Sequence, residues 1–99
     1  NLVVGERTSS SVPSQALYLM NSPFVREQAK GATQRLLKEK LAGDTARIEH
    51  AYRLALGRNA TSRERKIILT FLKEENDPNK AWIQVFQGLY ASLDFRYLN

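Results

Sequence analysis

The stretch ALGRNATSRE, residues 55–64, predicts the end of one helix and the start of the next. Gly57 lacks a Cβ and can adopt the left-handed backbone conformation in which helices commonly end. Thr61 and Glu64 have the S/T-x-x-E spacing of a capping box, in which each side chain accepts a hydrogen bond from the backbone N–H of the other residue. The intervening residues 58–60 are therefore expected to form the corner between two helices.

The sequence on both sides of this corner carries apolar residues at the spacing of a helix. Asp44 is the expected N-cap of the preceding helix, which ends at Gly57. Its inner stripe consists of Ile48, Ala51, Tyr52 and Ala55, with Leu54 and Leu56 widening the apolar face on both flanks. The helix after the corner has an expected buried face of Ile67, Ile68, Phe71 and Leu72. The width of the first of these faces predicts contact with more than one neighbouring helix.

Two further helices are indicated by their first residues and by an apolar stripe. Ser22 is an expected N-cap with Pro23 at the first helical position, and Gly43 is expected to close this helix. Its stripe is rich in alanine and consists of Val25, Ala29, Ala32 and Leu36. The last helix is expected to start at Asp77 and Pro78. Its stripe consists of Trp82, Val85, Phe86, Leu89 and Leu93, with Ile83 and Tyr90 at the edge.

The N-terminal part of the chain has a different pattern. Residues 1–12 are rich in serine, show no helical period and are expected to form an extended arm. Pro13 suits the first turn of a short helix that ends near Asn21. No segment shows the two-residue alternation of a strand. The sequence therefore predicts an all-α fold, a compact bundle of four main helices plus a short N-terminal helix, with residues 13–99 as a single helical domain.

Length and composition favour one folded domain. The 99 residues are 42% hydrophobic and 25% charged, and no apolar run approaches the roughly 20 residues that a membrane-spanning helix needs. The absence of cysteine excludes disulfides, thiolate metal sites and covalent haem attachment. The net charge of +5 suits an anionic partner, but solubility alone accounts for a charge of this size. The chain starts without Met or a signal peptide, and we expect a fragment of a larger multidomain protein.

The sequence contains no recognisable catalytic constellation, and it predicts no catalytic, cofactor-binding or metal-ligating residue. His50 is the only histidine and is placed on the solvent side of its helix. Glu74, Glu75 and Asp77 offer oxygen ligands for a weakly bound hard cation, but helix capping and solvation are the favoured interpretation. The aromatic residues of the last helix share one face, which predicts packing rather than a platform for stacking bases.

Basic residues concentrate at the corner. The residues predicted to contact an anion or a partner there are Arg58, Arg63, Arg65 and Lys66. Arg58 either pairs with a carboxylate or a helix-end carbonyl, or it binds an external anion, and we favour the first interpretation. Two helices joined by a short glycine-containing turn are also typical of the helix-turn-helix that binds nucleic acid. A solvated helix start with balancing carboxylates is the favoured alternative. Residues 59–61 match the N-x-T glycosylation pattern, to which we give little weight.

Three blocks of the sequence resemble a known family when they are taken in order. These blocks are RTSSSVPSQALYLMNSPFV, ARIEHAYRLALGRNATSRE and LYASLDFRYLN. Together, over residues 7–98, they resemble the C-terminal part of the planctomycete-type PSD domain family. The resemblance implies a domain of unknown function within large, exported proteins that often carry cytochrome c-like modules. A c-type haem would then belong to another module with a C-x-x-C-H motif, so no cofactor is expected in this chain.

The combined observations predict a non-catalytic helical interaction or structural subdomain at the C-terminus of a large exported protein. By resemblance, the location is extracytoplasmic and the partner is the remainder of the parent polypeptide or a second copy of the chain. One alternative is a basic helix-turn-helix-like nucleic-acid-binding module. The other is a subdomain of a larger extracytoplasmic enzyme, to whose active site this chain would contribute Arg58 or Tyr18. The sequence leaves open whether the parent protein is an enzyme.

Overall fold

The computed structural model describes residues 19–98, with side chains described through residue 92. The elements are α2 (Pro23–Lys38), α3 (Asp44–Leu56), α4 (Ser62–Glu74) and α5 (Pro78–Leu98). Residues 19–98 contain no strand, which confirms the all-α prediction for this part of the chain. Leu19 and Met20 are helical, but the rest of the predicted short N-terminal helix and the predicted arm lie outside the described residues.

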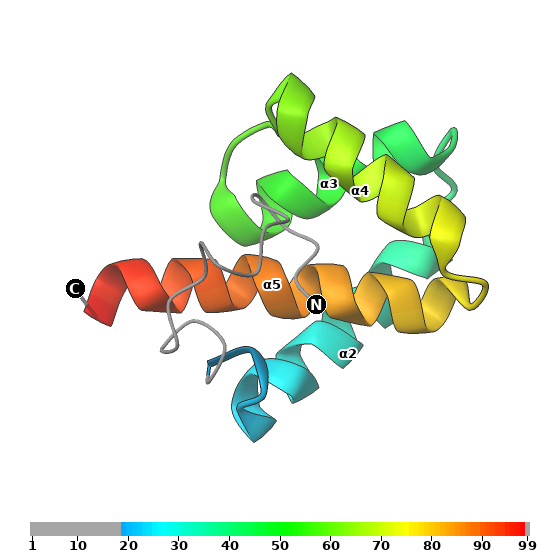
Figure 1. Ribbon diagram of the computed structural model, residues 1–99. Helices are drawn as coiled ribbons and strands as arrows, with labels where there is room; N and C mark the ends of the chain where they lie inside the picture. The colour runs from blue at the N-terminus through cyan, green and yellow to red at the C-terminus, as the bar shows by residue number, and fades with distance from the viewer. Residues whose placement is uncertain (1–18, 99) are drawn as a thin grey trace.

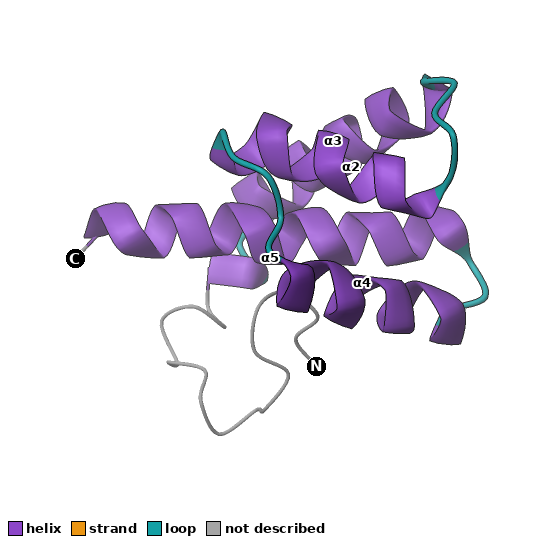
Figure 2. Cartoon of the chain, turned by 90° about the horizontal axis from the view of Figure 1, so that it is seen from above, coloured by secondary structure: helices purple, strands orange, loops and turns teal. Residues whose placement is uncertain are grey.

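Helix α5 lies at the centre of the bundle. Figure 1 shows α2 passing below and behind α5 and the pair α3 and α4 above it, and Figure 2, seen from above, shows α4 on one side of α5 and α3 on the other. Helix α5 contacts each of these three helices, and α3 contacts α2 and α4 as well as α5. The prediction that the helix ending at Gly57 touches more than one neighbour is therefore confirmed.

The predicted apolar stripes of α2, α3 and α5 form one core. Every predicted stripe residue of α2 and α3 is buried, and the same holds for the described stripe residues of α5. The largest fully buried side chains of the described residues are Trp82, Tyr52, Phe86, Leu36, Ile48, Ile68 and Leu89. Each such apolar side chain contributes about 1.5–3 kcal/mol to the free energy of unfolding. The aromatic rings of α5 pack in sequence, with centroids 6.3 Å apart for Trp82 and Phe86 and 5.8 Å apart for Phe86 and Tyr90.

The prediction that Gly43 closes the helix before it is wrong. Helix α2 ends at Lys38, because Glu39 has extended φ and ψ of −73° and 140°. The following loop places Leu41 against the core, and this contact requires the chain to leave the helix early. Gly43 instead occupies the N-cap position of α3 with a φ of 146°, which glycine tolerates best. The predicted N-cap Asp44 is the first residue of α3, and its side chain accepts a hydrogen bond from Arg47.

Two predicted apolar faces are narrower than expected. Leu54 does not widen the buried face of α3, because its side chain is 53% exposed, whereas Leu56 packs partly buried against the core. In α4 only Ile68 is fully buried, and Phe71 and Leu72 are partly buried. Helix α4 lies at the outer side of the bundle, so Ile68 is its one fully buried side chain. Ser22 occupies the predicted N-cap position of α2, but its side chain makes no capping hydrogen bond.

Candidate functional site

A left-handed glycine and a capping box stabilise the backbone of the corner between α3 and α4. Gly57 is left-handed, with φ and ψ of 70° and 20°, and its N–H donates to the carbonyl of Arg53. The Glu64 N–H donates to Thr61 Oγ1 over 3.1 Å, and the Thr61 N–H donates to Glu64 Oε1 over 2.9 Å. The predicted glycine terminator and the predicted capping box are therefore both confirmed.

Arg58 uses its guanidinium on groups of the corner itself. Nη1 donates to Glu64 Oε1 over 2.9 Å and Nη2 donates to Glu64 Oε2 over 3.0 Å, which is a bidentate ion pair. Nη1 also donates to the carbonyl of Asn59 over 3.0 Å. The edge of Arg58 that would bind an external anion is thus occupied by the carboxylate of Glu64. Of the alternatives that the sequence left open, the structure shows the pairing with a carboxylate.

The ring of Tyr52 packs against the Arg58 side of this ion pair. The Arg58 Cζ lies 5.5 Å from the centroid of the Tyr52 ring, a cation–π distance. Tyr52 is fully buried, and its hydroxyl has no hydrogen-bond partner among the described residues. Burial is the main cause that raises the pKa of this hydroxyl, and the negative charge of Glu64 raises it further. Tyr52 is therefore a neutral packing residue at physiological pH.

The ion pair also fixes the charge state of Glu64. The hydrogen bonds from the Arg58 side chain are the main cause that lowers the pKa of the Glu64 carboxyl. Burial opposes this effect, and the hydrogen bond from the Thr61 backbone adds to it. Glu64 is consequently ionised at neutral pH and serves as an acceptor for both the arginine and the helix cap. A carboxylate held in this way is a poor proton acceptor for catalysis.

A second carboxylate, Glu49 on α3, joins the helix to the corner and to α4. Its Oε1 accepts from the Ala60 N–H over 3.3 Å, and its Oε2 accepts from Arg65 Nη1 over 3.3 Å. Asn59 Oδ1 accepts from Arg53 Nη1 over 3.1 Å, which adds a further link across the turn. The role of Glu49 could not be predicted from the sequence, since its partners lie 11 and 16 residues away and no local spacing connects them.

The four predicted contact residues do not form one patch of equivalent cations. Arg58 and Arg65 are in ion pairs with Glu64 and Glu49. Arg63 and Lys66 are exposed on the first turns of α4, and their predicted contact with an anion or a partner stays a prediction. Tyr18, the other residue considered for an active site, lies outside the described residues.

Within residues 19–92, the remaining titratable side chains show no arrangement for chemistry. His50 is partly buried on α3. Among residues 19–92, no group of three or more His, Cys, Asp or Glu residues is placed to hold a metal ion. Asp77 Oδ1 caps α5 by accepting from the N–H of Asn79 and of Lys80, and Glu75 accepts from the Asp77 N–H. In the described part of the chain, the length and hydropathy of the helices fall short of what crossing a bilayer requires.

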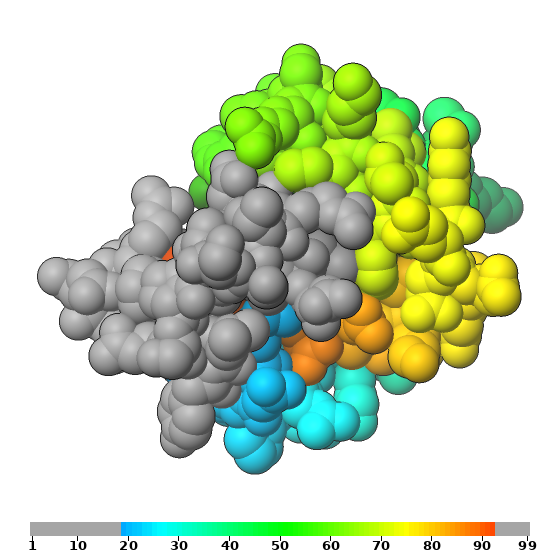
Figure 3. Space-filling model, in the orientation of Figure 1, coloured from blue at the N-terminus to red at the C-terminus, as the bar shows by residue number. Residues whose placement is uncertain are grey.

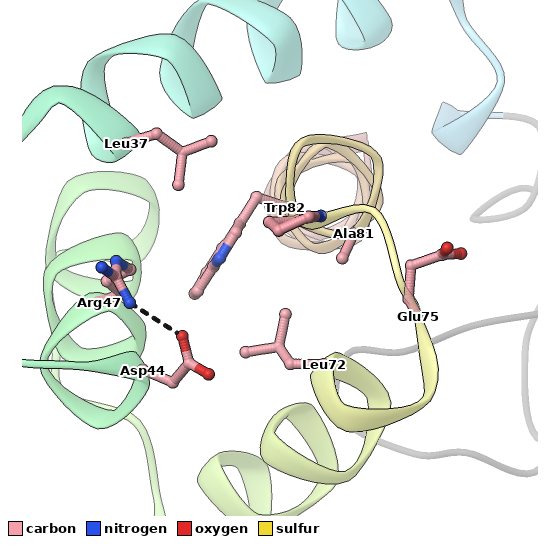
Figure 4. A pocket seen from close by; sticks show the side chains of 8 residues that line it. Leu37, Asp44, Arg47, Leu72, Glu75, Ala81 and Trp82 are labelled. Atoms are coloured by element: carbon pink, nitrogen blue, oxygen red, sulfur yellow. Dashed lines mark hydrogen bonds and ion pairs between the residues drawn. The ribbon is translucent and has the colours of Figure 1, made fainter.

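A pocket of about 230 Å³ lies at the end of the bundle where α2 ends and α5 begins. Figure 4 shows Leu37, Leu72 and Trp82 facing this space, with Asp44 and Arg47 at its edge. The Arg47 Nη1 and Asp44 Oδ1 atoms are 3.0 Å apart, so this carboxylate is already paired. The pocket therefore has apolar walls and a polar edge, where Asp44 pairs with Arg47 and Glu75 accepts a hydrogen bond from the Asp77 N–H.

Comparison with known proteins gave one match. The sequence pattern of the PSD1 family, described as protein of unknown function (DUF1553), matches residues 1–72. The matched part includes α2, α3, the whole corner and most of α4, whereas α5 and the third block of the resemblance lie beyond it. No curated protein and no solved structure matches the chain.

Proposed function

The chain belongs to the PSD1 family of proteins of unknown function, and from this premise we propose that it is a non-catalytic helical subdomain with a structural and interaction role in a larger exported protein. The exported location and the larger parent are supported by the resemblance of its sequence blocks to PSD-type proteins. The non-catalytic role is supported by the corner, where the arginines and carboxylates bond one another and the backbone.

The corner is the observation that carries this proposal. Its two carboxylates accept hydrogen bonds from two arginines and from two backbone N–H groups within the corner. These bonds satisfy polar groups that the end of α3 and the start of α4 would otherwise leave without partners. The polar side chains of this stretch thus define the angle between α3 and α4.

Nucleic-acid binding is the weaker candidate for the same surface. A helix-turn-helix binds the DNA backbone through cations that neutralise phosphates. Arg58 and Arg65 already neutralise carboxylates, so releasing them for phosphate would break two ion pairs. Binding to DNA would also weaken steeply as salt is raised, which gives a direct way to separate the two proposals.

The experiment compares Arg58→Ala and Arg58→Lys with the unchanged chain. Urea unfolding measures stability, and titration with inorganic phosphate and with duplex DNA, followed by amide NMR, measures binding. We expect both variants to lower the free energy of unfolding. Arg58→Ala should lower it by about 1.5 kcal/mol, because it removes the ion pair and the cation–π contact. Arg58→Lys also lowers it, because lysine cannot form the bidentate pair. We expect phosphate and DNA to cause no saturable shift at the corner. Saturable binding that Arg58→Ala removes without loss of stability would overturn the proposal.

A further inference from the structure

A groove between α2 and α5 lies apart from the corner and shares no residue with it. Its volume is about 400 Å³, and three basic side chains line it: Arg26 and Lys30 from α2 and Lys80 from α5. No carboxylate is among the described residues that line the groove. The cyan surface of α2 adjoins the orange surface of α5 in Figure 3. This basic groove therefore brings together three cations without a carboxylate in its lining.

The three cations are presented to solvent by two different helices. Arg26 and Lys30 are four residues apart and therefore lie on successive turns of the same face of α2. Lys80 lies in the first turn of α5, where Asp77 already caps the backbone. Lys30 Nζ is 3.5 Å from Glu27 Oε2, but the two side chains are 50% and 73% exposed. An ion pair with that exposure is weak, so a carboxylate of a ligand can compete for Lys30.

Amide side chains give the groove its hydrogen-bonding character. Asn79, Gln84 and Gln87 of α5 line it, and Ile83 adds an apolar contact between them. An amide side chain carries both a donor and an acceptor, which matches the alternating C=O and N–H groups of an extended peptide. Gln87 Nε2 donates to the carbonyl of Met20 over 3.0 Å, which fixes the position of the Gln87 side chain in the groove.

The length of the groove also fits a short peptide. From Asn79 to Gln87 a helix rises by about 12 Å, and about four residues of extended chain cover that distance. No aromatic side chain is among the described residues that line the groove, so it lacks a surface for stacking bases. Three cations with neighbouring amides therefore favour a polypeptide with several carboxylates over a nucleic acid.

We propose that the groove between α2 and α5 binds an extended acidic segment of a partner polypeptide. This inference rests on the proposed interaction role and names the chemistry of the partner. Lys30 and Lys80 hold carboxylates from opposite sides of the groove, Arg26 extends the basic side, and the amides of α5 bond the peptide backbone. The attraction is electrostatic, so it weakens as salt screens the exposed charges.

The test uses a fluorescein-labelled hexaglutamate peptide, with hexaglutamine and a single-stranded DNA oligonucleotide as comparison probes. Fluorescence anisotropy is measured with the full chain at about 20 mM and about 200 mM salt. The groove variant is Lys30→Glu combined with Lys80→Glu. The matched control is Lys40→Glu combined with Lys73→Glu, which changes the net charge equally at exposed positions outside the groove.

We expect the unchanged chain to bind hexaglutamate and not hexaglutamine, and the groove variant to bind at least about tenfold more weakly. The control should stay within roughly threefold of the unchanged chain. The amide NMR signals that shift with hexaglutamate should belong to α2 and α5. Equal losses in the two variants, tighter binding to the DNA, or no binding of the peptide up to about 1 mM would overturn the proposal.

Failure of the groove proposal can be distinguished from failure of the proposed structural role of the corner. Lys80→Glu places an acidic residue in the first turn of α5, where the helix dipole favours it, so the groove variant is expected to fold. Urea unfolding of both variants checks this directly. Failure of hexaglutamate to bind, with normal stability effects at Arg58, would reject the groove and leave the structural role of the corner in place.

Discussion

The ion pair between Arg58 and Glu64 should contribute measurably to stability, although it lies at the surface. The perturbation is a double-mutant cycle with Arg58→Ala, Glu64→Ala and the combined variant. Exposed ion pairs are usually worth about 0.2–1 kcal/mol. This pair is bidentate and its side chains are 44% and 18% exposed, which places it at the upper end of that range. We expect a coupling energy of about 1 kcal/mol.

The single variants should differ because the two residues have different further contacts. Arg58→Ala removes the pair and the cation–π contact with Tyr52, which together are worth about 1.5 kcal/mol. Glu64→Ala removes the pair and half of the capping box, which together are worth about 2 kcal/mol. The combined variant should lose about 2.5 kcal/mol, less than the sum, because the pair is lost only once.

Urea unfolding followed by circular dichroism is the appropriate assay, with Glu64→Gln as a control. Glutamine keeps an acceptor for the Thr61 N–H and removes the negative charge, so it should lose only the part that depends on the ion pair. A shift of about 4–8 °C in the melting temperature accompanies each kcal/mol in a domain of this size. A coupling energy of zero within about 0.3 kcal/mol would refute the view that this pair stabilises the corner.

Four further predictions concern the corner and, in the last case, helix α2. The pKa of the Glu64 carboxyl is lower in the folded chain than in the unfolded chain, where it is near 4.5. The contribution of Glu64 to stability is therefore complete above the unfolded pKa and is lost as the pH falls through the folded pKa. The difference in the free energy of unfolding between the unchanged chain and Glu64→Gln should shrink below about pH 4. Thr61→Ala should cost about 1 kcal/mol in urea unfolding, and Thr61→Ser should be close to neutral, because serine keeps the capping oxygen. Gly57→Ala should cost about 1 kcal/mol, since its φ is 70°. Gly31→Ala should gain about 0.5–1 kcal/mol, because an added Cβ meets only Arg35 at 3.5 Å. Melting temperatures that both rise or both fall in the two glycine variants would contradict this reasoning.

The features that the sequence predicted correctly depend on nearby residues. The capping box spans four residues, Gly57 ends a helix by its own conformational freedom, and the stripe of α3 repeats with each turn. Features that depend on distant contacts were missed. Glu49 reaches Ala60 and Arg65 across the fold, and no sequence spacing indicates that contact. The pairing of Arg58 with a carboxylate was foreseen as one alternative, but the identity of the carboxylate depends on the angle of the corner.

The early end of α2 shows how packing overrides local preference. Residues 38–40 are Lys, Glu and Lys, all of which favour helices, so nothing in the local sequence ends α2 before Gly43. The structure ends it at Lys38 because the loop must place Leu41 against the core and direct α3 back along α5. The exposure of Leu54 has the same origin, since the width of a buried face depends on where the neighbouring helices lie.

The position of α5 bears on what constitutes the structural unit of this family. The family match ends at Leu72, within α4 and before α5. However, the buried stripes of α2 and α3 form their core with Trp82, Phe86 and Leu89 of α5, and α2 has no contact with α4 that could replace this helix. An amphipathic helix gains most of its stability from packing its apolar face. Residues 23–72 alone would therefore expose their core, and the folded unit in this chain must include α5.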